Sequence, residues 1–113
     1  MKVQRKHERY SYELDVEVIF ENDDLHQARL LNFSLGGAFV QIDTLPAFAS
    51  KVTLLIDLPG VPERCRIPCY VRWIKDKETQ GMGIQFQYTR PIEVWALSKL
   101  IRKIKEGDGE TSS

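Results

Sequence analysis

Residues 11–20 read Ser-Tyr-Glu-Leu-Asp-Val-Glu-Val-Ile-Phe, and this stretch decides the fold class. Its apolar side chains recur at every second position, at Tyr12, Leu14, Val16, Val18 and Phe20. The residues between them are polar or charged, apart from Ile19. Because successive side chains of a strand point to opposite faces, this pattern predicts a β-strand with one buried face and one solvated face.

The same two-residue period continues to about residue 88. It predicts further strands over residues 25–33, 38–42, 51–58, 64–74 and 82–88. The alternation slips at Leu30-Leu31, which indicates a bulge or a change of facing element. About six short strands with no helix between them predict an antiparallel sheet, either sandwiched or closed on itself.

The period changes after Thr89. Apolar residues then recur at three- and four-residue steps, at Ile92, Trp95, Ala96, Leu100, Ile101 and Ile104. This stripe predicts a helix over residues 90–105 that docks on an open end or seam of the sheet. Gly107 is expected to end the helix and residues 107–113 to form a disordered tail. The chain is then one domain, residues 1–106, with a flexible basic arm at 1–10 and the β-structure at 11–88.

Charge limits the classes of partner. The 113 residues carry 16 Lys and Arg against 16 Asp and Glu, a formal net charge of zero. A binder of nucleic-acid polymers is therefore not expected, because such proteins neutralise phosphates with an excess of basic residues. The charge is uneven, however, because residues 1–9 hold four basic side chains and only Glu8 as an acid. Anions would be attracted to that end.

The two cysteines, Cys65 and Cys69, are expected to be reduced core thiols. Four positions along one strand place them about 13 Å apart, whereas a disulfide needs Cα atoms within about 7 Å. Reduced thiols fit the cytoplasm. The chain has neither the ~20-residue apolar run of a membrane span nor a secretory leader, so a cytoplasmic protein without membrane insertion is expected.

Two short motifs carry the candidate chemistry. Arg5 and Arg9 form R-x-x-x-R, which is either a solvated basic segment or a pair of guanidinium groups that bind phosphates and guanine. Asn32-Phe33-Ser34-Leu35-Gly36-Gly37 forms N-x-S-x-x-G. Its Asn32, Ser34, Gly36 and Gly37 suit a hairpin connection. They also suit a ligand site with an amide, a hydroxyl and accessible backbone N–H groups.

Taken together, in this order and spacing, the two motifs resemble the PilZ domain family. Val71-Arg72-Trp73 and Gly81-Met82-Gly83-Ile84-Gln85-Phe86 are similar to the C-terminal half of that family, so the resemblance covers essentially the whole chain. It implies an all-β fold, a six-stranded antiparallel β-barrel with a C-terminal α-helix.

The resemblance also implies a receptor for cyclic di-GMP, a bacterial second messenger, and not an enzyme. Arg5 and Arg9 would hold phosphates and guanine, and Asn32, Ser34 and Gly37 would bind on the barrel face over which the arm folds. Gln4 stands where many members have a further arginine, which leaves open whether one ligand or an intercalated pair binds.

The residues suggest how such a receptor would signal. An arm with cationic side chains and few apolar ones can be fixed across the barrel by a doubly anionic ligand, which is an order–disorder switch. The fixed arm would present a new surface to a downstream protein partner. Both a monomer and a homodimer are compatible with the helix stripe.

Three alternatives remain. The chain could be a PilZ-like adaptor that binds protein and no nucleotide, or an RNA- or single-strand-binding barrel, which needs stacking aromatics beside a basic groove. A metal site would draw on His7, His26, Cys65 and Cys69, but their spacing matches no compact zinc pattern and no metal or cofactor is expected. Trp73 and Trp95 are expected in the core, although Trp73 would border the ligand face if its strand bulges.

Overall fold

The computed structural model describes residues 10–88 and 90–112. Within them the chain forms six strands followed by one helix. The strands are β1 (Tyr10–Ile19), β2 (Leu25–Phe33), β3 (Gly37–Ile42), β4 (Lys51–Ile56), β5 (Cys65–Lys75) and β6 (Gly81–Phe86), and the helix is α1 (Pro91–Ser112). This order, strands followed by a helix, is the one predicted from the two-residue period up to residue 88 and the three- and four-residue steps after it.

The strands close into a barrel in the order β1-β2-β3-β6-β5-β4, and β4 pairs back onto β1. Every neighbouring pair is antiparallel. The predicted six-stranded antiparallel barrel with a C-terminal helix is confirmed, and of the two arrangements left open it is the closed one. Closure pairs the strand edges, which would otherwise be exposed to association with other chains.

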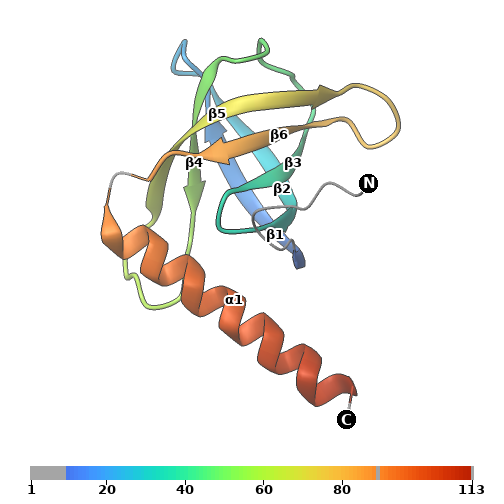
Figure 1. Cartoon of the computed structure of the whole chain (residues 1–113). Coiled ribbons are helices and arrows are strands. Elements are labelled where there is room, and N and C mark those ends of the chain that lie inside the picture. The colour runs from blue at the N-terminus through green and yellow to red at the C-terminus, as the bar shows by residue number, and fades with distance from the viewer. Residues whose placement is uncertain (1–9, 89, 113) are drawn as a thin grey trace, which may run out of the picture.

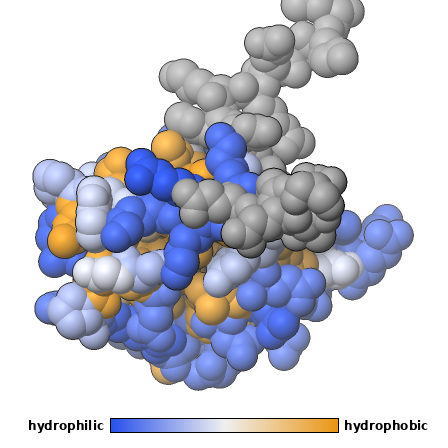
Figure 2. All heavy atoms as spheres, turned by 90° about the horizontal axis from the view of Figure 1, so that it is seen from below, coloured by the Kyte–Doolittle hydropathy of each residue, from blue (hydrophilic) through white to orange (hydrophobic). Residues whose placement is uncertain are grey.

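The inner face of the barrel is built from the alternating apolar residues. They include Val16, Val18, Leu30, Val40, Leu54, Ile67, Val71 and Met82, each of which is at most 2% exposed. The intervening side chains make the outside mainly hydrophilic, and on the face drawn in Figure 2 hydrophobic residues appear only as separate patches. Burying these side chains is the main term that stabilises the fold.

Helix α1 lies beside one end of the barrel, and its C-terminal half extends away from the strands (Figure 1). Its inner residues join the barrel core, and these are Ala96, Leu97, Leu100 and, partly buried, Ile101 and Ile104. The helix therefore docks on an end of the barrel, as predicted. Among the described residues, no helix combines the length and the apolar character that a membrane span requires.

The face that α1 buries differs from the predicted stripe at two positions. Ile92 is 42% exposed and Trp95 is 47% exposed, so the expectation that Trp95 lies in the core is wrong. Their places on the buried face are taken by Leu97 and Glu93, both 1% exposed. A carboxylate is tolerated there because Arg90 Nε lies 3.2 Å from Glu93 Oε2.

The helix is also longer than predicted. It continues through Gly107, which was expected to end it, and reaches Ser112. A glycine inside a helix costs about 1 kcal/mol relative to alanine but does not block the helical conformation. Gly107 therefore lowers the stability of the helix at its position but does not end the helix.

The two cysteines lie on the inner face of β5. Cys65 and Cys69 are both buried and free, which confirms the predicted core thiols. Burial raises the pKa of the Cys69 thiol to about 12. A thiol in this state is protonated at neutral pH and chemically inert.

Candidate functional site

Five residues form one continuous row across the outer face of the barrel. Each pairs with the next across a strand boundary, in the order Ser11, Asn32, Phe39, Gly83 and Trp73. The row runs over β1, β2, β3, β6 and β5. It therefore brings Asn32 of the second motif into line with two aromatic residues, Phe39 of the next strand and Trp73, which is distant in the sequence.

A bulge lies beside this row in three of the five strands. The pairing register shifts between Ser11 and Leu14 in β1, between Leu30 and Asn32 in β2, and between Val71 and Trp73 in β5. A bulge adds one residue to a strand and re-aims the side chains that follow it. The slip predicted at Leu30-Leu31 is thus confirmed as a bulge.

The bulges explain why Asn32 and Trp73 face outward. Leu30 and Val71 are buried in the core, and strict alternation would point the residues two positions later inward as well. The extra residue in each strand reverses the alternation, so that Phe33 takes the buried place after Leu30. Trp73 is 44% exposed, so the expectation that it lies in the core is wrong. The stated alternative applies instead, because its strand bulges and the side chain reaches the outer face.

A pocket of about 480 Å³ opens along the row. Its described lining consists of Tyr10, Ser11, Leu31, Asn32, Phe39, Trp73, Lys75 and Thr79. Pockets that hold small molecules have volumes of about 300–1,000 Å³ and combine apolar walls with a few polar groups. This pocket has both features.

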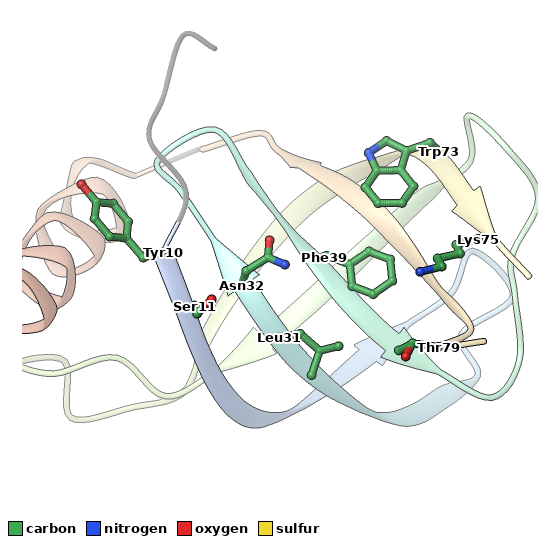
Figure 3. A pocket seen from close by; sticks show the side chains of 8 residues that line it. All are labelled: Tyr10, Ser11, Leu31, Asn32, Phe39, Trp73, Lys75 and Thr79. Carbon is green, nitrogen blue, oxygen red and sulfur yellow. The ribbon is translucent and has the colours of Figure 1, made fainter. Parts of the chain in front are cut away.

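The apolar wall of the pocket is an aromatic pair. The rings of Phe39 and Trp73 are stacked with centroids 5.2 Å apart and an angle of 16° between their planes. Both project from the same side of the sheet (Figure 3). Phe39 is 7% exposed but does not belong to the barrel core, because it is covered on the outer face.

The polar part of the pocket comes from neighbouring strands. Asn32 supplies an amide, Ser11 and Thr79 supply hydroxyls, and Lys75 is the only charged residue in the described lining. In Figure 3 the Lys75 side chain points back toward the aromatic pair. Lys75 Nζ lies 3.8 Å from Glu78 Oε1, an exposed pair that holds the ammonium only weakly.

The remaining residues of the second motif build the turn between β2 and β3. Ser34 N donates to Gly37 O at 2.8 Å, and Gly36 N donates to Ser34 Oγ at 3.1 Å. Gly36 O accepts from Phe86 N at 2.9 Å. Ser34, Gly36 and Gly37 are not among the described residues that line the pocket, and their hydrogen bonds fix the end of the strand that carries Asn32.

Two further contacts hold this turn against the barrel. A Cβ at Gly37 would lie 2.1 Å from Ile84 O, so the close pairing of β3 with β6 requires glycine there. Tyr88 Oη donates to Leu35 O at 2.7 Å. Burial raises the pKa of Tyr88, and the neutral hydroxyl remains available as a donor.

Of the predicted site residues, the structure places Asn32 at the pocket and Ser34, Gly36 and Gly37 in the adjacent turn. Arg5 and Arg9 lie outside the described residues. Sequence reasoning missed six lining residues: Tyr10, Ser11, Leu31, Phe39, Lys75 and Thr79. Two signals could have found some of them. Phe39 lies on the outward-facing side of the alternation in its strand, and the irregularity at Leu30-Leu31 lies in the strand that pairs with it.

The chain matches a protein family along almost its whole length. The model of the PilZ domain matches residues 3–106. The chain is similar to the PilZ domain with c-di-GMP of YcgR from Escherichia coli, with a TM-score of 0.70 and 16% identity over 97% of this chain and 98% of that one. No curated protein sequence matches the chain.

Two longer proteins are similar as well. The K. pneumonia MrkH–c-di-GMP complex has a TM-score of 0.74 and 12% identity, over 97% of this chain and 55% of that one. The inhibitor of motility MotI/DgrA from Bacillus subtilis has a TM-score of 0.68 and 24% identity, over 90% of this chain and 52% of that one. The chain thus spans about half the length of these two proteins, and at such identities the likeness concerns the fold.

Proposed function

The chain belongs to the PilZ domain family, and from this premise we propose that it is a receptor for cyclic di-GMP. The observation that carries the proposal is the pocket beside Asn32. The outward-facing residue of the second motif opens onto a pocket with an aromatic wall and one cation, which are the groups that a purine nucleotide binds. Solved structures with this fold include complexes with c-di-GMP.

The two motifs have separate tasks in this proposal. Arg5 and Arg9 bind the phosphates and a guanine, since guanidinium groups match phosphate oxygens and the acceptor edge of guanine. Asn32 offers a donor and an acceptor to a base edge. Ser34, Gly36 and Gly37 hold the turn and its backbone groups in the conformation against which the ligand binds.

Signalling follows from the position of the first motif. Arg9 is followed directly by Tyr10, and Tyr10 lines the pocket. A ligand in the pocket that also holds Arg5 and Arg9 fixes the segment before β1 in one conformation. The surface made by this segment and the ligand is then recognised by a protein partner, and the chain itself carries out no catalytic step.

Isothermal titration calorimetry with cyclic di-GMP tests the proposal. We expect binding at micromolar or lower concentration, and a loss of at least tenfold in affinity for Arg9→Ala and for Asn32→Ala. Arg66→Ala is the matched control, because Arg66 is an exposed arginine that lines a different depression, together with Pro68 and Gln87. Its removal takes away the same charge and should leave the affinity unchanged.

The titration also separates the receptor from the adaptor. A flat titration of folded wild-type protein would reject the receptor and leave a PilZ-like adaptor that binds protein alone. An equal loss of affinity in Arg66→Ala and Arg9→Ala would indicate that the ligand is attracted by general charge, and it would reject the assignment to the two motifs.

A further inference from the structure

The outer side of α1 combines an exposed tryptophan with basic residues. Trp95, Lys99 and Arg102 recur at steps of four and three residues, so they share one side of the helix. Leu97 and Leu100 are buried on the opposite side, against the barrel. The side that carries Trp95 is therefore largely left to solvent when the helix has docked.

The charge on this part of α1 has one sign. From Val94 to Lys105 the helix contains four basic residues and no acidic one, and acids return only from Glu106 onward. The basic residues are Lys99, Arg102, Lys103 and Lys105, and all four are exposed. None of them forms an ion pair with another described side chain. The zero net charge of the whole chain thus includes a local excess of cations, which attracts an anionic surface.

Trp95 is held in place while part of its ring stays free. A Cβ at Gly60 would lie 3.1 Å from Cζ3 of the indole, so the ring rests on the loop between β4 and β5. Lys99 Nζ lies 4.7 Å from the centroid of the same ring. Ile92 and Val94, in the same part of the helix, are exposed as well. An apolar group is therefore presented in a fixed position beside cations.

We propose that this side of α1 adsorbs to a membrane surface that carries anionic lipids. Tryptophan suits the level of the headgroups, because its ring is apolar and its N–H group is polar. Each basic residue near an anionic membrane surface raises membrane binding by about fivefold. The same charges keep the helix at the level of the headgroups. This inference does not depend on cyclic di-GMP.

Single exposed apolar residues are common on soluble proteins and need no partner. Here three of them, Ile92, Val94 and Trp95, lie within four positions and lead directly into the cationic stretch. Exposed apolar residues together with Lys and Arg on one helix are typical of helices that lie on membrane surfaces.

An acidic protein would attract the same cations, but the side chains favour lipid headgroups. Ser98 is the only uncharged polar residue from Val94 to Lys105, so this stretch offers few hydrogen-bonding groups of fixed geometry to a protein partner. Lysine and arginine have long flexible stems that lie along apolar surface and leave the charged end in water. Mobile headgroups accommodate such side chains without a fixed arrangement.

Cosedimentation of the full chain with lipid vesicles tests the proposal. We expect binding to vesicles of equal parts phosphatidylcholine and phosphatidylglycerol, and binding weaker by about tenfold or more to phosphatidylcholine alone. Raised salt should release the protein, because it screens the attraction between exposed charges. Lys99→Glu combined with Arg102→Glu should abolish the preference for the anionic vesicles.

Lys51→Glu combined with Lys77→Glu is the matched control, because it changes the net charge by the same amount. Lys51 begins β4, and Lys77 lies in the turn between β5 and β6, away from α1 (Figure 1). This pair should keep most of the binding. Thermal unfolding of each variant shows whether the barrel is folded, so that lost binding is not confused with lost structure.

Tryptophan fluorescence reports the contact itself, because Trp73 and Trp95 are the only tryptophans. In Trp73→Phe the emission comes from Trp95, and anionic vesicles should shift it to shorter wavelength. In Trp95→Phe the emission comes from Trp73 on the outer face of the barrel, and it should not shift. Trp95→Ala should weaken vesicle binding several-fold.

The outcomes separate the membrane from other occupants of this side of α1. No binding of the folded wild-type chain to anionic vesicles would overturn the proposal, and so would equal losses in the two charge-reversed pairs. A dimer in sedimentation velocity that Trp95→Ala abolishes, without vesicle binding, would assign the side to a second copy of the chain. A shift of Trp95 emission with polyglutamate but not with vesicles would assign it to an acidic protein. Both results would overturn the membrane, and neither uses cyclic di-GMP, so the receptor is tested separately.

Discussion

Gly37 and Gly83 illustrate how one residue type serves two needs in this barrel. A Cβ at Gly37 would meet the backbone oxygen of Ile84 at 2.1 Å, whereas a Cβ at Gly83 would meet the side chain of Trp73 at 2.2 Å. A paired backbone cannot move without breaking the β3–β6 hydrogen bonds, but an exposed indole can rotate away. We expect Gly37→Ala to lower the free energy of unfolding by about 2–3 kcal/mol or more, and Gly83→Ala by about 1 kcal/mol.

Urea denaturation of both variants measures this difference. The matched control is Gly83→Ala in the Trp73→Ala background, where the colliding side chain is gone. Because the two substitutions act on one contact, their effects should not add, and the cost of Gly83→Ala should nearly vanish. Equal losses for Gly37→Ala and Gly83→Ala would contradict the distinction between a backbone and a side-chain collision.

Cys69 sets part of the alkaline limit of stability. Burial raises the pKa of Cys69 to about 12 from its ordinary value of 9.0. Between these values the unfolded chain has released the thiol proton and the folded chain has kept it. Stability must therefore fall as the pH rises from about 9 toward 12, by up to about 1.4 kcal/mol per pH unit for one group.

Replacing Cys69 by Val removes the titrating group and keeps an apolar side chain. We expect the decline in the free energy of unfolding above pH 9 to become shallower in Cys69→Val, with little change of slope near neutral pH. Tyr88→Phe is a useful comparison, since burial also raises the pKa of Tyr88 and its removal flattens the curve at the upper end. An identical slope in Cys69→Val and wild type would show that the thiol does not contribute.

At the scale of elements, α1 offers a test of which face packs on the barrel. Leu97 is 1% exposed and lies in the core cluster, whereas Trp95 is 47% exposed. We expect Leu97→Ala to cost about 2–5 kcal/mol, as for other buried leucines. Trp95→Ala should cost less than about 1 kcal/mol, although the sequence pattern alone assigns Trp95 to the buried stripe.

Chemical denaturation of the two variants under the same conditions provides the comparison. A larger loss for Trp95→Ala than for Leu97→Ala would mean that the helix packs through the face that the sequence predicted. The error in that prediction has a physical origin. Hydrophobic periodicity ranks positions by residue type, and it cannot foresee that Arg90 makes a buried place acceptable to Glu93.

The strands were predicted more completely than the helix face. Alternation identifies the inner face because burial of that face is the main term that stabilises a barrel. It also located the bulge at Leu30-Leu31, where two apolar residues interrupt the pattern. It could not place Trp73, since an indole suits either face and only the pairing of β5 with β6 shows the extra residue.

The pocket could be predicted only in part. Asn32 was found because it belongs to a motif whose parts are close in the sequence. Its neighbours in space come from two other strands, Phe39 from β3 and both Trp73 and Lys75 from β5. Their meeting depends on the strand order of the closed barrel and on three bulges, which are properties of the pairing and not of any single segment.

At the scale of the whole molecule, the proposed signal is a change in the segment before β1. The number of residues that the ligand can fix is limited by the balance between lost backbone entropy and the free energy of the new hydrogen bonds. Fixing the backbone costs about 1–2 kcal/mol per residue, so holding residues 5–9 costs about 5–10 kcal/mol. Two bidentate arginines supply about four charge-assisted hydrogen bonds of about 1.5–3 kcal/mol each. At the midpoints of these ranges the hydrogen bonds supply about 9 kcal/mol, which offsets the cost of about 7.5 kcal/mol for residues 5–9 but not the cost of about 13.5 kcal/mol for all nine residues from Met1.

Amide hydrogen exchange followed by mass spectrometry measures this limit. With saturating cyclic di-GMP we expect exchange to slow by at least tenfold over residues 5–9 and to change little over residues 1–3. Peptides that cover residues 96–104 of α1, the part of the helix that packs on the barrel, serve as the internal control. They should exchange at the same rate with and without ligand. In Arg9→Ala at saturation, the protection of residues 5–9 should be lost because one of the two clamps is absent.

The pattern of protection also decides between two kinds of receptor. If exchange slows at the pocket, in peptides that contain Phe39 and Trp73, but remains fast over residues 5–9, the ligand binds the barrel without engaging the first motif. The signal would then have to leave through the barrel surface itself. Protection that extends undiminished to Met1 would show that contacts beyond the two arginines stabilise the segment, because the hydrogen bonds of two guanidinium groups do not offset the entropy of nine residues.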